Sequence, residues 1–359
     1  MVHTFGIIGS GSWSTALAKI LTDNKNKINW WIRNEETIKH LLARHHNPQY
    51  LSSVFFDTDL LIPTTNVSEV IKNSDYIIIA VPSAYAADTL GNLDKNIFNG
   101  KKIISAIKGI LPDQNLLLND YLKQEFRVEL DNYFAVLGPC HAEEVASEKL
   151  SYLTFSGIDE KTTTEIASHF KTDYLNTIVN HDIYGVQFAA ILKNIYALGA
   201  GIAHGLDYGD NFLSVLIANS ADEMAGFLRK AGIKNIDVGH ISDERKPGNG
   251  NKHPDGNLET TNTHTNYAAS VYLGDLLVTC YSLYSRNRTF GNMIGKGYSV
   301  KTAQLELGMV AEGYNASKCM HIINETVNAD MPIADTVYKI LWQHMPASEG
   351  FAKIEETLV

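Results

Sequence analysis

A strand–turn–helix stretch near the N-terminus, FGIIGSGSWSTALAKIL, constrains the fold of this 359-residue chain more than any other feature. The run TFGIIG predicts a buried strand, and STALAKIL places apolar residues at helical spacing. Gly9 and Gly11 match the first two glycines of the G-x-G-x-x-G turn, which lets a pyrophosphate approach a helix N-terminus. We therefore expect a dinucleotide-binding turn at the start of a doubly wound sheet. The alternative is an ordinary glycine-rich connection.

The third glycine of that pattern is replaced by Ser14. A glycine at this point serves to let the helix pack closely on the strand, whereas the first two shape the turn and admit the ligand. Serine adds little volume. The turn is therefore expected to keep its ligand-facing glycines and to lose little in helix packing.

Apolar runs alternate with helical spacing through the first half of the chain. Nearly continuous apolar strands separated by helical segments indicate parallel strands covered on both faces. Residues 1–183 are therefore expected to form a Rossmann-like, doubly wound α/β domain. Six further runs are expected to be strands of its sheet, the last two as extensions: residues 28–34, 75–83, 101–109, 132–139, 151–157 and 175–180.

The pattern after about Tyr184 is helical. Long apolar helices are expected at 185–206 and 212–232, so residues 184–359 are interpreted as an all-α, substrate-binding domain. Residues 240–266 interrupt this pattern with a polar segment rich in Gly, Asn, Asp, His and Thr, which is expected to be a long surface loop or disordered insertion. Its histidines lack the spacing of a ligand set, so no metal site is predicted.

Composition limits the classes of binding partner and the cellular compartment that are expected. A net charge of -10 argues against nucleic acid or an anionic membrane, but it leaves room for a small phosphate bound by local cations. Three widely separated cysteines suggest no disulfide framework, which fits a cytoplasmic protein. Because no apolar run approaches the ~20 residues of a membrane span, no integral membrane segment is expected.

The segment WWIRNEE, at the end of the second expected strand, bears on which nucleotide is bound. An NAD-specific site usually has Asp or Glu there, to bind the ribose 2′-hydroxyl. Arg33 takes the position here, and a guanidinium suits a 2′-phosphate. We therefore expect NAD or NADP as cofactor, with NADPH somewhat favoured. A solvated surface charge is the alternative for Arg33.

Two lysines fall at points where a charged side chain is unusual. Lys108 follows the buried run KKIISAI, at the end of a strand where ligands bind in this fold, and Lys193 lies among small and apolar residues in AAILKNIYALGAG. Burial lowers the pKa of a lysine and lets it exchange protons near neutral pH. Lys193 is predicted to be such a group and Lys108 to hold a substrate oxygen or phosphate. The alternatives are a snorkelling side chain and a flexible surface lysine, respectively.

The segment 274–297 supplies further polar groups. SRNR places the forked cations Arg286 and Arg288 beside an amide, a chemistry that suits phosphate, although a solvated loop fits equally well. Asp275 opens an apolar helical run. It is either a charge at a helix N-terminus or a partner for the predicted catalytic lysine.

The motifs GSGSW, VPS, KG, GPCHAEE, LKN, GDL, SRNR and VAEG occur in this order, and the chain from Met1 to about Lys339 resembles the bacterial type of NAD(P)-dependent glycerol-3-phosphate dehydrogenase. The resemblance implies a cytoplasmic enzyme, often a homodimer, that reduces dihydroxyacetone phosphate to sn-glycerol 3-phosphate for glycerophospholipid synthesis. Lys193, Lys108 and Asp275 form the implied catalytic set, with Lys193 as the proton acceptor for alcohol oxidation. Besides Gly9 and Gly11, the implied cofactor contacts are Ser12, Trp13, Arg33, Lys108, Ala142, Arg286, Val310 and Glu312. The implied substrate contacts are Lys108, Gly138, Cys140, Lys193, Asp275, Ser285, Arg286 and Asn287.

The chain departs from this family at Ser14, at Cys140, where Ser or Thr is common, and in the longer polar segment before Gly274. His141 precedes a helical-looking AEEVA and is interpreted as a capping or surface residue, outside the catalytic set. Two other functions remain compatible with the sequence. One is another two-domain NAD(P)-dependent reductase of a hydroxy acid or sugar-acid phosphate, and the other is a dinucleotide sensor without catalysis.

Overall fold

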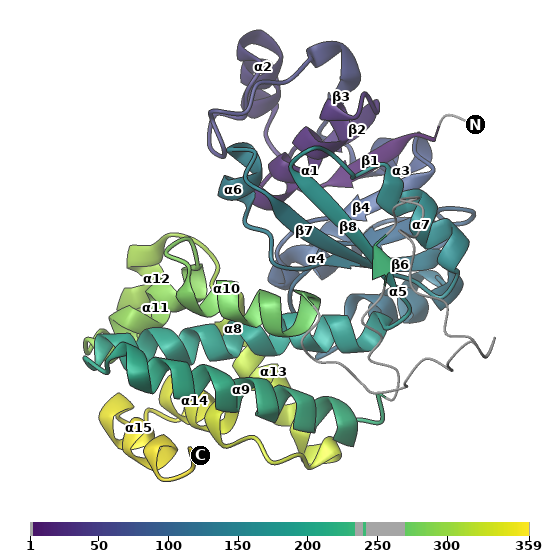
Figure 1. Cartoon of the computed structure of the whole chain (residues 1–359). Helices are drawn as coiled ribbons and strands as arrows, with labels where there is room; N and C mark the ends of the chain where they lie inside the picture. Colours follow the sequence, from purple (N-terminus) through teal and green to yellow (C-terminus); the bar gives the residue numbers. More distant parts are fainter. Residues whose placement is uncertain (1–2, 234–239, 242–269, 359) are drawn as a thin grey trace, which may run out of the picture.

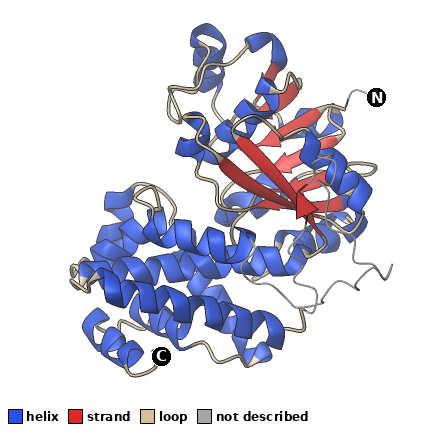
Figure 2. Ribbon diagram, in the orientation of Figure 1, coloured by secondary structure: helices blue, strands red, loops and turns tan. Residues whose placement is uncertain are grey.

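Strands and helices separate into two lobes. The structure, a computed structural model, describes residues 3–233, 240–241 and 270–358. Figure 1 shows the chain building the upper lobe first and the lower lobe last, with the long helix α8 along their boundary. In Figure 2 the strands lie in the upper lobe and the lower lobe is built from helices. The expected fold class, a Rossmann-like sheet domain followed by a helical domain, is confirmed.

One nine-stranded sheet forms the upper lobe, in the order β3-β2-β1-β4-β5-β6-β7-β8-β9. The strands expected to be parallel are parallel to one another. Their bounds are β1 (Phe5–Ile8), β2 (Ile28–Trp31), β4 (Tyr76–Ile79), β5 (Lys102–Ser105) and β6 (Tyr133–Leu137).

The outer strands depart from a uniformly parallel sheet. The two expected extensions are present as β7 (Ser151–Ser156) and β8 (Leu175–Asn180), and β7 runs antiparallel to β6. A parallel pairing needs a crossover that packs on the sheet, and the connection before β7 holds only the short helix α6 (Ala142–Ala146). Sequence reasoning missed the edge strand β3 (Leu61–Thr64). It also missed β9 (His240–Ile241), which lies in the expected polar insertion and pairs antiparallel with β8; the remainder, 242–266, lies outside the described residues.

Alternate residues of each strand face two separate apolar cores. Ile8 and Ile79 face one core, whereas Ile7 and Ile78 face the other, and all four side chains are fully buried. Helices therefore cover both faces of the sheet, as the continuous apolar runs predict. These helices are α1 (Ser12–Asp23), α2 (Glu35–Arg44), α3 (Val67–Lys72), α4 (Ser83–Leu90), α5 (Leu118–Phe126), α6 and α7 (Glu160–Ser168).

The helix α8 (Ile183–Gly205) joins the lobes. Its first half packs on the sheet, where the Tyr133 hydroxyl donates a hydrogen bond of 2.8 Å to Gln187 Oε1, and its second half enters the helical lobe. By length and composition α8 could cross a membrane, but 94% of its most apolar window is buried inside the protein. The other helices of the lower lobe are α9 (Asp210–Lys230), α10 (Asp275–Tyr281), α11 (Arg286–Gly295), α12 (Val300–Leu307), α13 (Glu312–Val327), α14 (Pro332–Trp342) and α15 (Ala347–Glu355).

Glycines let α8 and α11 cross in backbone contact. A Cβ added at Gly201 would lie 2.1 Å from the Arg288 carbonyl oxygen, and one at Gly291 would lie 2.0 Å from the Leu198 carbonyl oxygen. Gly205 and Gly295 meet one turn further on in the same way. This crossing fixes α8, which carries the predicted catalytic lysine, against α11, which carries the predicted anion-binding residues.

Candidate active site

The turn between β1 and α1 has the geometry of a dinucleotide cradle. Gly9 has a φ of +137°, and a Cβ there would lie 2.6 Å from the Ala80 carbonyl oxygen, so glycine is required. Gly11 is the N-cap of α1 without a side-chain cap, and a Cβ there would meet no atom within 4 Å. The open space and the free N–H groups fit a pyrophosphate. Ser14 is buried and its hydroxyl donates to the Gly11 carbonyl oxygen at 2.9 Å, so it packs as expected of a small residue.

Three of the residues implied as cofactor contacts lie shortly after β1, β2 and β5. Trp13 lies in the first turn of α1, with its indole Nε1 buried and without a partner among the described residues. Lys108 Nζ stands over the Trp13 ring at 4.8 Å from the centroid, a cation–π contact that joins the two predicted contacts. Arg33 is exposed just beyond the end of β2, next to Asn34, the N-cap of α2.

Lys193 and Asp275 form a buried ion pair at the junction of the lobes. The Lys193 Nζ lies 2.5 Å from Asp275 Oδ1, and the two side chains are only 3% and 2% exposed. The snorkelling alternative for Lys193 is therefore wrong. Asp275 is the first residue of α10, and its other oxygen, Oδ2, is buried without a partner among the described residues. Asp275 Oδ1 fixes the position of the Lys193 ammonium, and Oδ2 remains free to accept a hydrogen bond. The pair is therefore suited to transferring a proton between the ammonium and a bound ligand.

Burial lowers the pKa of Lys193 to about 8. The negative charge of Asp275 opposes this effect, and the positive charge of Lys108 reinforces it. A group that titrates near neutral pH can release and recover a proton during turnover. The predicted proton donor thus has both the burial and the pKa that its role requires.

A chain of side-chain amides ties the backbone of Lys108 to the helical lobe. Asn194 Nδ2 donates to the Lys108 carbonyl oxygen at 2.9 Å, and Asn194 Oδ1 accepts from Asn287 Nδ2 at 2.9 Å. Asn287 Oδ1 in turn accepts from the backbone N–H of Gly313 at 2.9 Å. Asn287 is 7% exposed and thus acts first as an internal bridge between α8, α11 and α13. Its predicted substrate contact stays a prediction.

Glu312 links the helical lobe to the sheet lobe. It begins α13, and its carboxylate accepts from the backbone N–H of Ser83 at 3.1 Å and from the Ser83 hydroxyl at 2.5 Å. Ser83 begins α4 beside the end of β4, so the bond spans the two lobes. A Cβ at Gly109 would lie 2.6 Å from both the Glu312 carboxylate and the Ser83 hydroxyl, which explains the glycine after Lys108.

The remaining predicted residues lie beside strand ends or helix starts. Cys140 is buried and its pKa is raised by burial to about 12, so the thiol stays protonated and is a weak hydrogen-bond partner. Ser285 is buried as the N-cap of α11, and Arg286 is exposed at its first turn. Gly138 has a φ of +141° at the end of β6, Ala142 begins α6, and Val310 is half-buried before α13.

Sequence reasoning missed two residues of the candidate site, and its interpretation of a third needs a correction. Asn194 and Ser83 both lie within the motifs LKN and VPS, but their spacing alone gives neither a role. His141 occupies the N-cap position of α6, yet its side chain makes no capping bond, so its interpretation as a capping residue is wrong.

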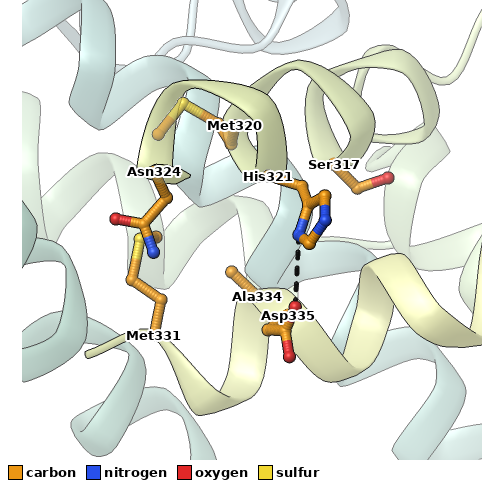
Figure 3. Close-up of a pocket in the computed structure, with 7 residues that line it drawn as sticks. All are labelled: Ser317, Met320, His321, Asn324, Met331, Ala334 and Asp335. Carbon is orange, nitrogen blue, oxygen red and sulfur yellow. Dashed lines mark ion pairs between the residues drawn. The ribbon is translucent and has the colours of Figure 1, made fainter. Parts of the chain in front are cut away.

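A small pocket elsewhere in the helical lobe has no comparable chemistry. It lies between α13 and α14, where His321 and Asp335 already pair with each other at 3.3 Å (Figure 3). Its lining contains no lysine or arginine. The seven residues are Ser317, Met320, His321, Asn324, Met331, Ala334 and Asp335.

Comparison with known proteins places the chain in a family. Residues 4–163 match the model of the NAD-dependent glycerol-3-phosphate dehydrogenase N-terminus, and residues 182–244 and 253–352 match that of its C-terminus. The glycerol-3-phosphate dehydrogenase [NAD(P)+] of Bacillus subtilis is 32% identical over 337 residues, which cover 94% of this chain and 89% of the relative.

Solved structures share the fold. Glycerol-3-phosphate dehydrogenase from Coxiella burnetii has a TM-score of 0.83 at 24% identity, covering 99% of both chains. The yeast enzyme has a TM-score of 0.75 at 22% identity, covering 99% of this chain and all of the other. From the family models and the Bacillus relative together, the chain belongs to the NAD-dependent glycerol-3-phosphate dehydrogenase family.

Proposed function

We propose that this protein reduces dihydroxyacetone phosphate to sn-glycerol 3-phosphate with NADH or NADPH. The observation that carries the proposal is the buried Lys193–Asp275 pair, in a chain whose Gly9–Gly11 turn leaves open space at a helix N-terminus. Family membership supplies the substrate, and the ion pair supplies a group that can protonate it. A dinucleotide sensor would have no need of a desolvated lysine with a single fixed counter-ion.

The residues of the candidate site have different roles in the proposed reaction. A bound nicotinamide nucleotide supplies the hydride for C2 of the substrate. Lys193 Nζ donates a proton to the C2 oxygen, and in the reverse direction it accepts that proton. Asp275 Oδ1 holds the ammonium in place, while Oδ2 is available to the hydroxyl that forms at C2. Lys108 adds positive charge that polarises the carbonyl.

The substrate phosphate is assigned to the start of α11. Arg286 is exposed there beside the N-cap Ser285, where a guanidinium and the N-terminus of a helix both favour an anion. Asn287 would contribute its amide from the same turn. With this assignment, the phosphate would lie on the helical lobe and the carbonyl at the junction of the lobes.

A steady-state assay tests the activity and separates it from its alternatives. Oxidation of NADH and of NADPH is followed by absorbance with dihydroxyacetone phosphate, with small 2-keto acids and with sugar-acid phosphates. Turnover with dihydroxyacetone phosphate alone supports the proposal. Preference for a keto acid would support a different two-domain reductase, and tight NADPH binding without turnover on any substrate would support a sensor.

The pKa of Lys193 predicts the pH dependence of both directions. Reduction needs the protonated amine, so kcat/KM for dihydroxyacetone phosphate should fall above pH about 8, tenfold per unit. Oxidation of sn-glycerol 3-phosphate needs the free amine and should rise up to about the same pH. Because Asp275 raises the pKa of Lys193, Asp275→Asn should move both limbs to lower pH. If neither pH dependence changes in Asp275→Asn, a group other than Lys193 is responsible for the titration.

Arg33 is proposed to favour NADPH through the 2′-phosphate. Arg33→Ala should raise the KM for NADPH roughly tenfold, the usual loss when a charge-assisted hydrogen bond is removed, and should change the KM for NADH little. The matched control is Arg44→Ala, at the other end of α2, where the chain carries an exposed arginine. Equal changes for the two nucleotides would show that Arg33 is only a surface charge.

We further propose a cytoplasmic homodimer that supplies the backbone of glycerophospholipids. The reducing compartment fits three cysteines that are all free and buried. Sedimentation of the purified protein and complementation of a strain that requires glycerol would test the assembly and the metabolic role.

A further inference from the structure

His141 has a ring nitrogen, Nε2, that forms no hydrogen bond with any described residue of the candidate site. The residue follows Cys140 at the end of β6, and its Nε2 is buried without a partner among the described residues. Buried polar atoms are nearly always hydrogen-bonded, so an orphan of this kind points to a missing ligand. No step of the proposed reaction employs it.

The surroundings bring this imidazole close to the predicted catalytic residues. The ring lies 6.2 Å from the ring of Tyr284, between centroids, and the backbone of Val278 on α10 is near enough to raise its pKa. Lys108, Lys193 and Asp275 lie near enough for their charges to affect its pKa. His141 is therefore a neighbour of the whole predicted catalytic set.

The protonation state of the ring follows from these contacts. Burial, reinforced by the charges of Lys108 and Lys193, lowers the pKa of His141 to about 4, so the imidazole is neutral at physiological pH. Nε2 has no partner among the described residues, so we assign the ring proton to Nδ1, which can donate toward the Val278 backbone. A neutral imidazole with its proton on Nδ1 offers Nε2 as a hydrogen-bond acceptor.

We propose that His141 Nε2 accepts a hydrogen bond from the C1 hydroxyl of dihydroxyacetone phosphate and so selects for a hydroxyl-bearing substrate. This inference rests on the function proposed above. The carbonyl oxygen and the phosphate dianion of the substrate only accept, and the C1 hydroxyl is its donor. An acceptor such as Nε2 has that hydroxyl as its natural partner.

A second orphan acceptor supports the assignment. Asp275 Oδ2, like His141 Nε2, is buried without a partner among the described residues. The product, sn-glycerol 3-phosphate, carries two free hydroxyls, one at C1 and one formed at C2. The new C2 hydroxyl arises beside the Lys193–Asp275 pair, so Asp275 Oδ2 suits C2 and His141 Nε2 suits C1.

The test compares dihydroxyacetone phosphate with its analogue lacking the C1 hydroxyl, CH3–CO–CH2–OPO3²⁻. In the native protein the analogue leaves Nε2 unpaired, and its kcat/KM should be lower by roughly 10- to 100-fold. His141→Phe should abolish most of the difference between the two substrates. It should reduce kcat/KM for dihydroxyacetone phosphate but change kcat/KM for the analogue by less than about threefold. His141→Gln, whose amide oxygen also accepts, should restore part of the discrimination.

Several outcomes would overturn the proposal. Equal losses on both substrates would mean that His141 only shapes the cleft, and an unchanged ratio would mean that Nε2 faces no substrate hydroxyl. A raised KM for NADPH, equal with the two substrates, would assign the imidazole to the nucleotide. His169→Phe is the matched control, since it removes another half-buried imidazole of lowered pKa from the sheet lobe and should leave the ratio unchanged. If the native protein reduces no dihydroxyacetone phosphate at all, the proposed function fails instead.

Discussion

Lys193→Ala is expected to lower kcat for dihydroxyacetone phosphate by roughly 10²–10⁴-fold, the usual contribution of a positioned acid or base. The loss follows from the position of Nζ, which is buried at the junction of the lobes and held at 2.5 Å by Asp275. Affinity for NADPH, measured by fluorescence titration, should change little, because the Gly9–Gly11 turn is distant in the chain and is built from other elements.

Lys19→Ala is the matched control for this experiment. Lys19 is also a buried, paired lysine, with its Nζ 2.6 Å from Asp23 and 2.9 Å from Glu148, and it lies on α1 within the sheet lobe. Its loss should reduce stability while leaving kcat within a few-fold of the native value. Near-normal turnover in Lys193→Ala, or equal losses in the two variants, would remove Lys193 from the catalytic set.

Gly291→Ala is expected to destabilise the helical lobe strongly, although it adds only one methyl group. The new Cβ would lie 2.0 Å from the Leu198 carbonyl oxygen and 2.9 Å from the Ile202 nitrogen, both of them backbone atoms of α8. A backbone cannot rotate away as a side chain can, so the two helices must separate. The free energy of unfolding should fall by about 3 kcal/mol or more, measured by urea denaturation.

Gly226→Ala provides the matched control. Gly226 also lies inside a helix, α9, but a Cβ there would meet no atom within 4 Å. Replacing it should raise the free energy of unfolding by about 0.5–1 kcal/mol, because alanine is the better helix former. If both variants behaved alike, the backbone contact between α8 and α11 would not be as close as the structure has it.

The sequence predicted the strands that are buried on both faces and missed those at the edges. The strands β1, β2, β4, β5 and β6 have continuous apolar runs because neighbours cover them on both faces. The edge strand β3 has the sequence LIPT, with Pro63 in its middle and Ile62 43% exposed, so it carries neither a long apolar run nor an alternating pattern.

The candidate site shows the same division between local and long-range information. The burial of Lys193 could be predicted because its helical neighbours are small and apolar. Its contact with Asp275 could not, since helical spacing says nothing about a partner from another element. The same reason explains His141, which looks like an ordinary helix start in sequence and comes close to Lys108 and Lys193 only in the folded chain.

The apolar core that α8 shares with the sheet has a consequence for how such a chain can evolve. Ile79 and Leu137 of the sheet belong to the same continuous core as Leu198 and Phe290 of the helical lobe. A recombination event that joined this sheet domain to an unrelated partner would leave that face of the sheet open to water. New substrate ranges in this lineage should therefore arise by point substitution around the cleft, with both halves inherited together.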